Sequence, residues 1–291
     1  MAAIKECLKQ IKRRPIIFIY TAIMMLVLCV IEEFNPVTKE YGSFKVLFKQ
    51  SYVDTLSMFA QRIKDLAQTP GIMALNIIVA ILIVLAFSAI MGIFGAGHGH
   101  VMYLSFVSEK KRKGEFRQGI NKHYVKVMFY IFFSMLLSAL FTVAIAYVMI
   151  PAIMSVKIVL AGDSGSIFVM LAISVLTVGV VYMSSVFFVM TLSVIFPAMI
   201  AYKKGGITVA FRMVRGYCWY LIPRVTLFMF VMLLSEAGLL AIGFGLASVA
   251  TTVIALIANW IIKTLAVFIY MYFIFGAFMG MKEDMFPSYS E

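Results

Sequence analysis

The sequence predicts an all-α protein, a polytopic transmembrane helical bundle, on three observations. Hydrophobic residues make up 63% of the 291 residues and charged residues only 13%, whereas soluble domains carry about a quarter charged residues. The mean hydropathy of +1.02 is correspondingly high. Long apolar runs recur along the chain, and the alternating segments of about ten residues that a membrane β-barrel needs are absent. We therefore expect one integral membrane domain over residues 1–291.

Six apolar runs reach the length of about 20 residues that a helix needs to cross the hydrocarbon layer. The first follows a basic start and lacks a small-residue cleavage site, so we expect a retained span rather than a signal peptide. The stretch from 225 to 280 is too long for one crossing and divides at a weak break near 248–252. The fourth and sixth runs exceed the minimum and are expected to tilt or to extend beyond the bilayer. The predicted spans are 15–31, 72–97, 127–150, 167–200, 225–247 and 250–280.

The distribution of Lys and Arg predicts the orientation of these spans. Segments 1–14, 109–126 and 201–224 are strongly basic, whereas the five basic residues of 32–70 are balanced by five acidic ones. Segment 151–166 has one of each. Because basic loops stay in the cytoplasm, both termini are predicted to be cytoplasmic.

Three segments outside the spans are predicted to be helical. Residues 45–67 place apolar side chains at helical spacing and are expected to form an outer amphipathic helix that ends before the second span. Residues 110–126 and 203–222 are expected to be cytoplasmic interfacial helices, each with a basic turn, a glycine and the pair Phe-Arg before the next span. Aligning Phe116 with Phe211 suggests a parallel repeat of a span, an interfacial helix and a span.

The formal net charge of +12 is explained by basic residues near the ends of spans, where they meet anionic lipid headgroups. A nucleic-acid-binding protein would instead need a basic soluble domain, so no nucleic acid is expected as a partner. The predicted headgroup contacts are Lys110, Lys111, Arg112, Lys113, Arg117, Lys203, Lys204, Arg212 and Arg215.

The stretch "GIFGAGHGH", residues 92–100, raises the question of a metal or phosphate site. No phosphate-loop spacing is present. His98 and His100 are two positions apart and point to opposite sides of a helix, so they could share a metal only if the chain unwound. Glycine also permits close packing of membrane helices. Close packing and a frayed helix end are therefore favoured over a metal site, for which these two histidines remain the weak candidates.

Two charged residues fall near the middle of predicted spans, Glu236 in the fifth and Lys263 in the sixth. A single charge at the bilayer centre costs about 2.5–3.5 kcal/mol on insertion scales, so pairing is favoured. We expect the two side chains to face each other, with Asn259 one turn before Lys263 on the same face. The pair is either a structural ion pair or a substrate or ion site at the midplane.

Two longer stretches carry a family resemblance. "SEKKRKGEFRQGINKHYVKVMFYIF" and "IFPAMIAYKKGGITVAFRMVRGYCWYLIP" resemble bacterial six-span membrane proteins of the glycerophosphodiester-phosphodiesterase membrane-domain-like group. The resemblance covers the pattern of residues 72–280, including Pro197, the Gly205–Gly206 pair and Trp219. It implies a six-span architecture and a bacterial cell membrane, and it implies no particular activity because no soluble phosphodiesterase domain accompanies it.

The functional prediction is a transport or export component, permease-like, for a small or lipid-like solute. Catalytic motifs for hydrolases and metalloproteases are absent from the sequence, so no enzyme activity is expected. The three cysteines lack ligand spacing, and no cofactor is expected. Partners would be the bilayer, an ATPase subunit or a second copy of the chain. The alternative is a non-catalytic membrane scaffold that binds another protein or lipid.

Overall fold

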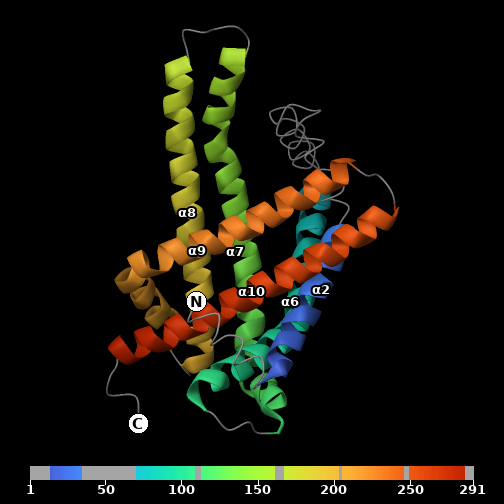
Figure 1. Cartoon of the computed structure of the whole chain (residues 1–291), viewed down its shortest axis with the longest axis vertical. Coiled ribbons are helices and arrows are strands. Elements are labelled where there is room, and N and C mark those ends of the chain that lie inside the picture. The colour runs from blue at the N-terminus through green and yellow to red at the C-terminus, as the bar shows by residue number, and fades with distance from the viewer. Residues whose placement is uncertain are drawn as a thin grey trace. The chain divides into compact units, whose positions relative to one another are not determined.

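The computed structural model describes residues 14–34, 70–108, 113–160, 167–202, 205–245 and 249–285 (Figure 1). Over these ranges the chain is helical and contains no strand, in agreement with the predicted all-α class. Six helices are present in the described parts: α2 (Pro15–Phe34), α6 (Pro70–Val107), α7 (Glu115–Leu160), α8 (Ile167–Ala201), α9 (Gly206–Gly245) and α10 (Val249–Met285).

Five of these helices, α6 to α10, are long and apolar enough to cross a membrane. The apolar part of α2, Pro15–Val30, is shorter than the other five. With 46 residues, α7 is about 70 Å long, more than twice the thickness of a hydrocarbon layer. The length and composition of these helices define a multi-span helical membrane protein.

Two predicted boundaries differ from the helix ends in the structure. α6 continues through the glycine-rich stretch to Val107, ten residues beyond the predicted end of the second span. α7 begins at Glu115 without a break at residue 126, so the described part of the predicted interfacial helix 110–126 is continuous with the span that follows. Hydropathy marks where the chain becomes polar, and a helix that is packed against protein can continue past that point.

The predicted interfacial helix 203–222 corresponds to the first part of α9, which is interrupted at Tyr217 by non-helical backbone angles (φ −120°, ψ 21°). Both α7 and α9 begin directly after a glycine with a positive φ, 83° at Gly114 and 75° at Gly205. The carbonyl of each glycine accepts the first hydrogen bond of its helix. A left-handed residue at these positions favours glycine, which explains why a basic turn with glycine precedes each helix.

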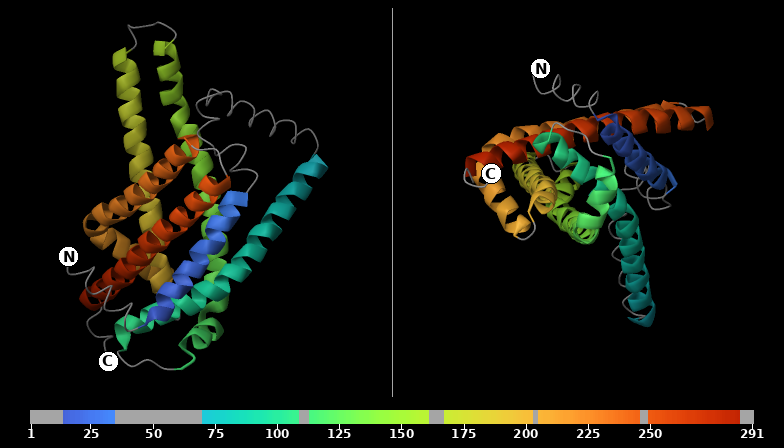
Figure 2. Two further views of the ribbon diagram at one scale, coloured as in Figure 1. Left: turned by 45° about the vertical axis from the view of Figure 1, so that its right-hand side comes forward. Right: turned by 90° about the horizontal axis from the view of Figure 1, so that it is seen from below.

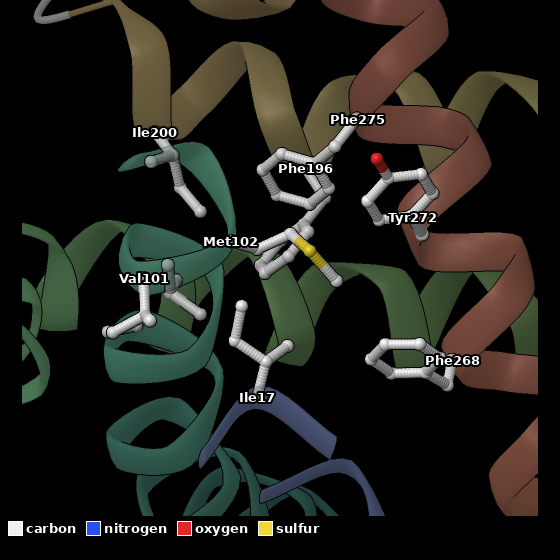
Figure 3. Close-up of a cluster of buried hydrophobic side chains, with 10 residues drawn as sticks. Ile17, Val101, Met102, Phe196, Ile200, Phe268, Tyr272 and Phe275 are labelled. Atoms are coloured by element: carbon white, nitrogen blue, oxygen red, sulfur yellow. The ribbon is translucent and has the colours of Figure 1, made fainter. Parts of the chain in front are cut away.

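The chain divides into two compact units. The first unit contains α2, α6 from residue 88 onward and the beginning of α7 up to residue 131. It also contains the described residues from 189 onward. Within it, α10 packs against both α9 and α2 (Figures 1 and 2). Its apolar core draws on α2, α6, α7, α8 and α10. Figure 3 shows Met102 among the labelled core side chains, with the rings of Phe196, Tyr272 and Phe268 on one side and Val101 on the other.

The second unit contains the beginning of α6 and residues 132–188, where α7 and α8 lie side by side (Figure 2). The rings of Phe141 and Phe188 stack between these two helices with centroids 4.3 Å apart. Farther along the pair is an open, almost wholly apolar groove of about 410 Å³. Its lining residues are Met149, Ala152, Ile153, Val156, Ser174, Thr177, Val178, Val181 and Tyr182.

The glycines of α6 allow the helix to approach its neighbours closely. A Cβ atom at Gly92 would lie 3.1 Å from the Cα of Met128 on α7, and one at Gly95 would lie 3.0 Å from Val127. A side chain at Gly97 would overlap the ring of Phe116, and one at Gly99 would overlap Ile200 of α8. The packing interpretation of these glycines is therefore confirmed. The expected fraying is wrong, because close contact with α7 and α8 keeps this stretch helical.

Candidate functional site

Three polar residues lie within two turns of α10, Asn259, Lys263 and Thr264, and we call them together the α10 patch. Lys263 is only 5% exposed and Thr264 3%. Asn259 lies one turn before Lys263, the spacing that places two residues on one helix face. Among the described residues, the buried Asn259 Oδ1 and Thr264 Oγ1 atoms make no hydrogen bond. This apolar helix thus buries the ionisable side chain of Lys263. It also buries two oxygen atoms, Asn259 Oδ1 and Thr264 Oγ1, that accept or donate no hydrogen bond among the described residues.

A tryptophan next to this patch connects α10 to α2. The Nε1 of Trp260 donates a hydrogen bond of 2.8 Å to the carbonyl oxygen of Ala22. This bond joins residues that are 238 positions apart in the chain. It fixes the rotation of α10 relative to α2, and therefore the direction in which the α10 patch faces.

The predicted partner of Lys263 is Glu236, which lies within the backbone of α9. The side chain of Glu236 is outside the described residues, so the expected Glu236–Lys263 contact stays a prediction. α9 and α10 do pack against each other in the first unit, which is the arrangement that the contact would need.

A second polar region, which we call the α6–α7 junction, lies where α6 ends and α7 begins. Arg14 and Glu115 form an ion pair there, with 3.2 Å between Nη1 and Oε2 and side chains only 4% and 7% exposed. Arg14 also donates hydrogen bonds to the carbonyl oxygens of Val101 (3.3 Å) and Ser108 (3.2 Å). Its guanidinium thereby ties the start of α2 to the last two turns of α6 and gives the Ser108 carbonyl, which follows the helix, a donor. Glu115 occupies the first turn of α7, where a negative charge is favoured by the helix dipole.

All three histidines of the chain lie in this junction and are buried, with exposures of 3%, 5% and 4% for His98, His100 and His123. His98 faces α2, where its Nε2 lies 3.5 Å from the hydroxyl of Thr21. His100 faces α7 instead, where its ring centroid is 5.2 Å from that of His123. The two histidines of "GHGH" therefore contact different helices.

The predicted headgroup residues that the structure describes are all exposed. These are Lys113, Arg117, Arg212 and Arg215. The remaining five, Lys110, Lys111, Arg112, Lys203 and Lys204, lie outside the described residues, as does the outer helix 45–67. Exposed cations close to the starts of α7 and α9 are free to meet anionic lipid, which is the role that the sequence predicts for them.

The Arg14–Glu115 pair and the His100–His123 contact are not predicted from the sequence. There, Arg14 belongs only to the basic segment 1–14, and His123 has no assigned role. Neither pairing has a local signal, because the partners of each come from different helices. Within the described residues, no group of three or more His, Cys, Asp or Glu side chains is placed to hold a metal ion.

The fold and these two regions define a multi-span helical membrane protein that buries charged and polar groups among its helices. No protein-family model, curated protein or solved structure matches the chain. Its function must therefore be argued from its own residues.

Proposed function

We propose that this chain is a transport component, permease-like, that moves a small or lipid-like solute across a bacterial cytoplasmic membrane, with the α10 patch as the contact for the polar part of that solute. The observation that carries this proposal is the burial of Lys263 beside Asn259 Oδ1 and Thr264 Oγ1, two atoms without a hydrogen bond among the described residues. Buried polar atoms are nearly always hydrogen-bonded, and an exception calls for an explanation. A polar solute that binds during transport supplies one.

The membrane setting strengthens this argument. Ionisable residues inside membrane-spanning helices are rare because they are costly, and they commonly mark the pathways of ions and substrates. Lysine donates three hydrogen bonds, asparagine both donates and accepts, and threonine does the same. The α10 patch is therefore suited to a polar or anionic group, such as a carboxylate or a phosphate.

The proposed topology has six crossings, with α2 as the first and both termini in the cytoplasm. Support comes from the excess of Lys and Arg in segments 1–14, 109–126 and 201–224. Among the described residues, the exposed cations Lys113, Arg117, Arg212 and Arg215 belong to two of these segments. In this topology they face the anionic inner leaflet.

The first test is uptake by proteoliposomes. Purified protein would be reconstituted and incubated with an isotopically labelled extract of bacterial metabolites, and the luminal contents would be measured by mass spectrometry. We expect at least one labelled compound to accumulate with the wild type. Lys263→Met should reduce that accumulation by about ten-fold, since a hydrogen bond to a charged group contributes about 1.5–3 kcal/mol. Ile261→Ala, on an exposed position of the same turn, serves as the matched control and should retain uptake.

A second arm tests a lipid-like solute. Proteoliposomes would contain a phosphatidylglycerol with a nitrobenzoxadiazole label, and external dithionite would bleach the label in the outer leaflet. Without transbilayer movement about half of the label is protected, and movement of lipid lowers that fraction. If neither arm shows transport, and the protein instead purifies with one stoichiometric protein partner, the scaffold alternative replaces the transport proposal.

A further inference from the structure

The contact between His100 of α6 and His123 of α7 has the properties of a metal-binding pair. Both side chains are at least 95% buried. Among the described residues, no ring nitrogen of either histidine makes a hydrogen bond that meets the usual distance and angle limits. Buried ring nitrogens without a well-formed hydrogen bond are unusual, because burying a polar group without a hydrogen bond costs free energy.

The separation of the two rings agrees with a shared metal ion. Their centroids are 5.2 Å apart and their planes are inclined by 39°. Two imidazoles that bind one tetrahedral zinc ion, each at about 2.0–2.1 Å through one nitrogen, have ring centroids about 5 Å apart. The separation of the two rings is therefore the one that a common ion requires.

The backbone holds the two histidines at this distance. A Cβ atom at Gly119 would lie 2.5 Å from the Cβ of His100 and 2.8 Å from the carbonyl oxygen of Ala96. Only glycine at position 119 allows α7 to pass so close to α6. His123 follows Gly119 by one helical turn and thus faces the same side of α7.

The charges around the pair are mixed. Glu115 interacts electrostatically with His100, as does Lys122, and Gln118 lies within hydrogen-bonding reach. Lys122 and Lys126 also act on His123. Lys122 is exposed, so water screens its charge, and Lys126 is directed to the carbonyl oxygen of Tyr202 at 3.4 Å. The acidic group that acts on His100 is the carboxylate of Glu115, which is also paired with Arg14.

We propose that His100 and His123 bind one divalent transition-metal ion, of the class of Zn²⁺, Co²⁺ or Ni²⁺, and that this ion joins α6 to α7. Imidazole nitrogen suits these metals, whereas Mg²⁺ and Ca²⁺ prefer oxygen ligands. Two protein ligands leave further coordination positions for water or a carboxylate. His98 has no part in the site, because it faces α2.

The test uses the full-length protein in detergent, purified without a polyhistidine tag and stripped of metal. Zn²⁺ alone would be titrated and followed by calorimetry, and Co²⁺ would be followed by its visible ligand-field absorption. We expect one saturable ion per chain and a higher unfolding temperature when Zn²⁺ is present. His100→Asn and His123→Asn should each weaken binding by about ten-fold or more, a loss typical of an impaired metal site. The double variant should add little to either single loss.

His98→Asn is the matched control, since His98 is equally buried on the same helix, and it should bind Zn²⁺ like the wild type. Circular dichroism would verify that each variant is folded. X-ray absorption at the zinc edge of the wild-type protein needs no variant and should show two imidazole ligands at about 2.0 Å. The proposal is overturned if the wild type shows no saturable binding, if the spectrum contains no imidazole, or if His98→Asn loses binding to the same extent.

Discussion

The two compact units bury their side chains very differently. In the first unit, large residues such as Phe275 and Phe278 are completely buried. In the second, Phe168, Val175 and Leu140 are 85%, 72% and 68% exposed. The first unit also contains the Arg14–Glu115 pair, the histidines and Lys263, whereas the described buried polar residues of the second are Ser155 and Thr177. The first unit also exposes apolar side chains, such as Leu233 at 66%, but it has a buried core with specific contacts as well. The second unit is mostly apolar surface of the kind that lipid covers.

The largest expected effect is the loss of one charge from the α6–α7 junction. Glu115→Gln removes the carboxylate that pairs with the buried guanidinium of Arg14, and we expect the free energy of unfolding to fall by about 3–5 kcal/mol. Unfolding in mixed micelles with increasing denaturing detergent would measure this change. The double variant Arg14→Met with Glu115→Leu should recover most of the loss, because it removes both charges. If the single variant loses only about 1 kcal/mol or less, as expected for an exposed ion pair, then the buried Arg14–Glu115 pair does not stabilise the first unit.

An intermediate effect is expected when a glycine is replaced in each unit. Gly119→Ala places a methyl group against the backbone of α6, and we expect a loss of about 1–3 kcal/mol in the same unfolding assay. Gly179→Ala, in the second unit, has no atom within 4 Å of the added carbon. That control should be neutral or stabilising by up to about 1 kcal/mol, since alanine favours the helix. If the two substitutions lower the free energy of unfolding equally, close helix packing does not distinguish the first unit from the second.

The smallest effect is expected within the second unit. Phe141→Leu removes the stacked contact with Phe188, and the expected loss is about 0.5–1.5 kcal/mol, which is the contribution of an aromatic pair beyond its burial. Phe168→Leu, at an 85% exposed position, should leave stability unchanged. Thermal unfolding in lipid nanodiscs would measure both variants. A loss for Phe141→Leu as large as that for Glu115→Gln would mean that the second unit has a specific core of its own.

The features that could be predicted from the sequence are those with a local signature. Twenty or more consecutive apolar residues identify a membrane helix wherever they occur, so the positions of α6 to α10 were foreseen. The division of residues 225–280 into two helices agrees with the prediction, although α10 begins at Val249 and so includes most of the break expected near 248–252. The separation of His98 from His100 follows from helical geometry alone.

The features that could not be predicted depend on contacts between distant residues. A composition rule assigns Arg14 to the lipid headgroups, and only the fold brings Glu115 and the carbonyl of Val101 to it. In the same way, the neighbour of His100 comes from the next helix, and no spacing within "GHGH" indicates it. The helix continues past the predicted end of the second span because the residues that follow pack against α2, α7 and α8, which hydropathy does not register.

The ion pair of Arg14 has a consequence for how the chain is made. Arg14 precedes Glu115 by about a hundred residues, which a ribosome adds in about 5–20 s at 5–20 residues per second. During that interval α2 has been synthesised, whereas the carboxylate of Glu115 and the carbonyl groups of Val101 and Ser108 that contact Arg14 have not all been made. These contacts form only after the start of α7 has been synthesised, so the packing of the start of α2 against α6 and α7 is a late step of biogenesis.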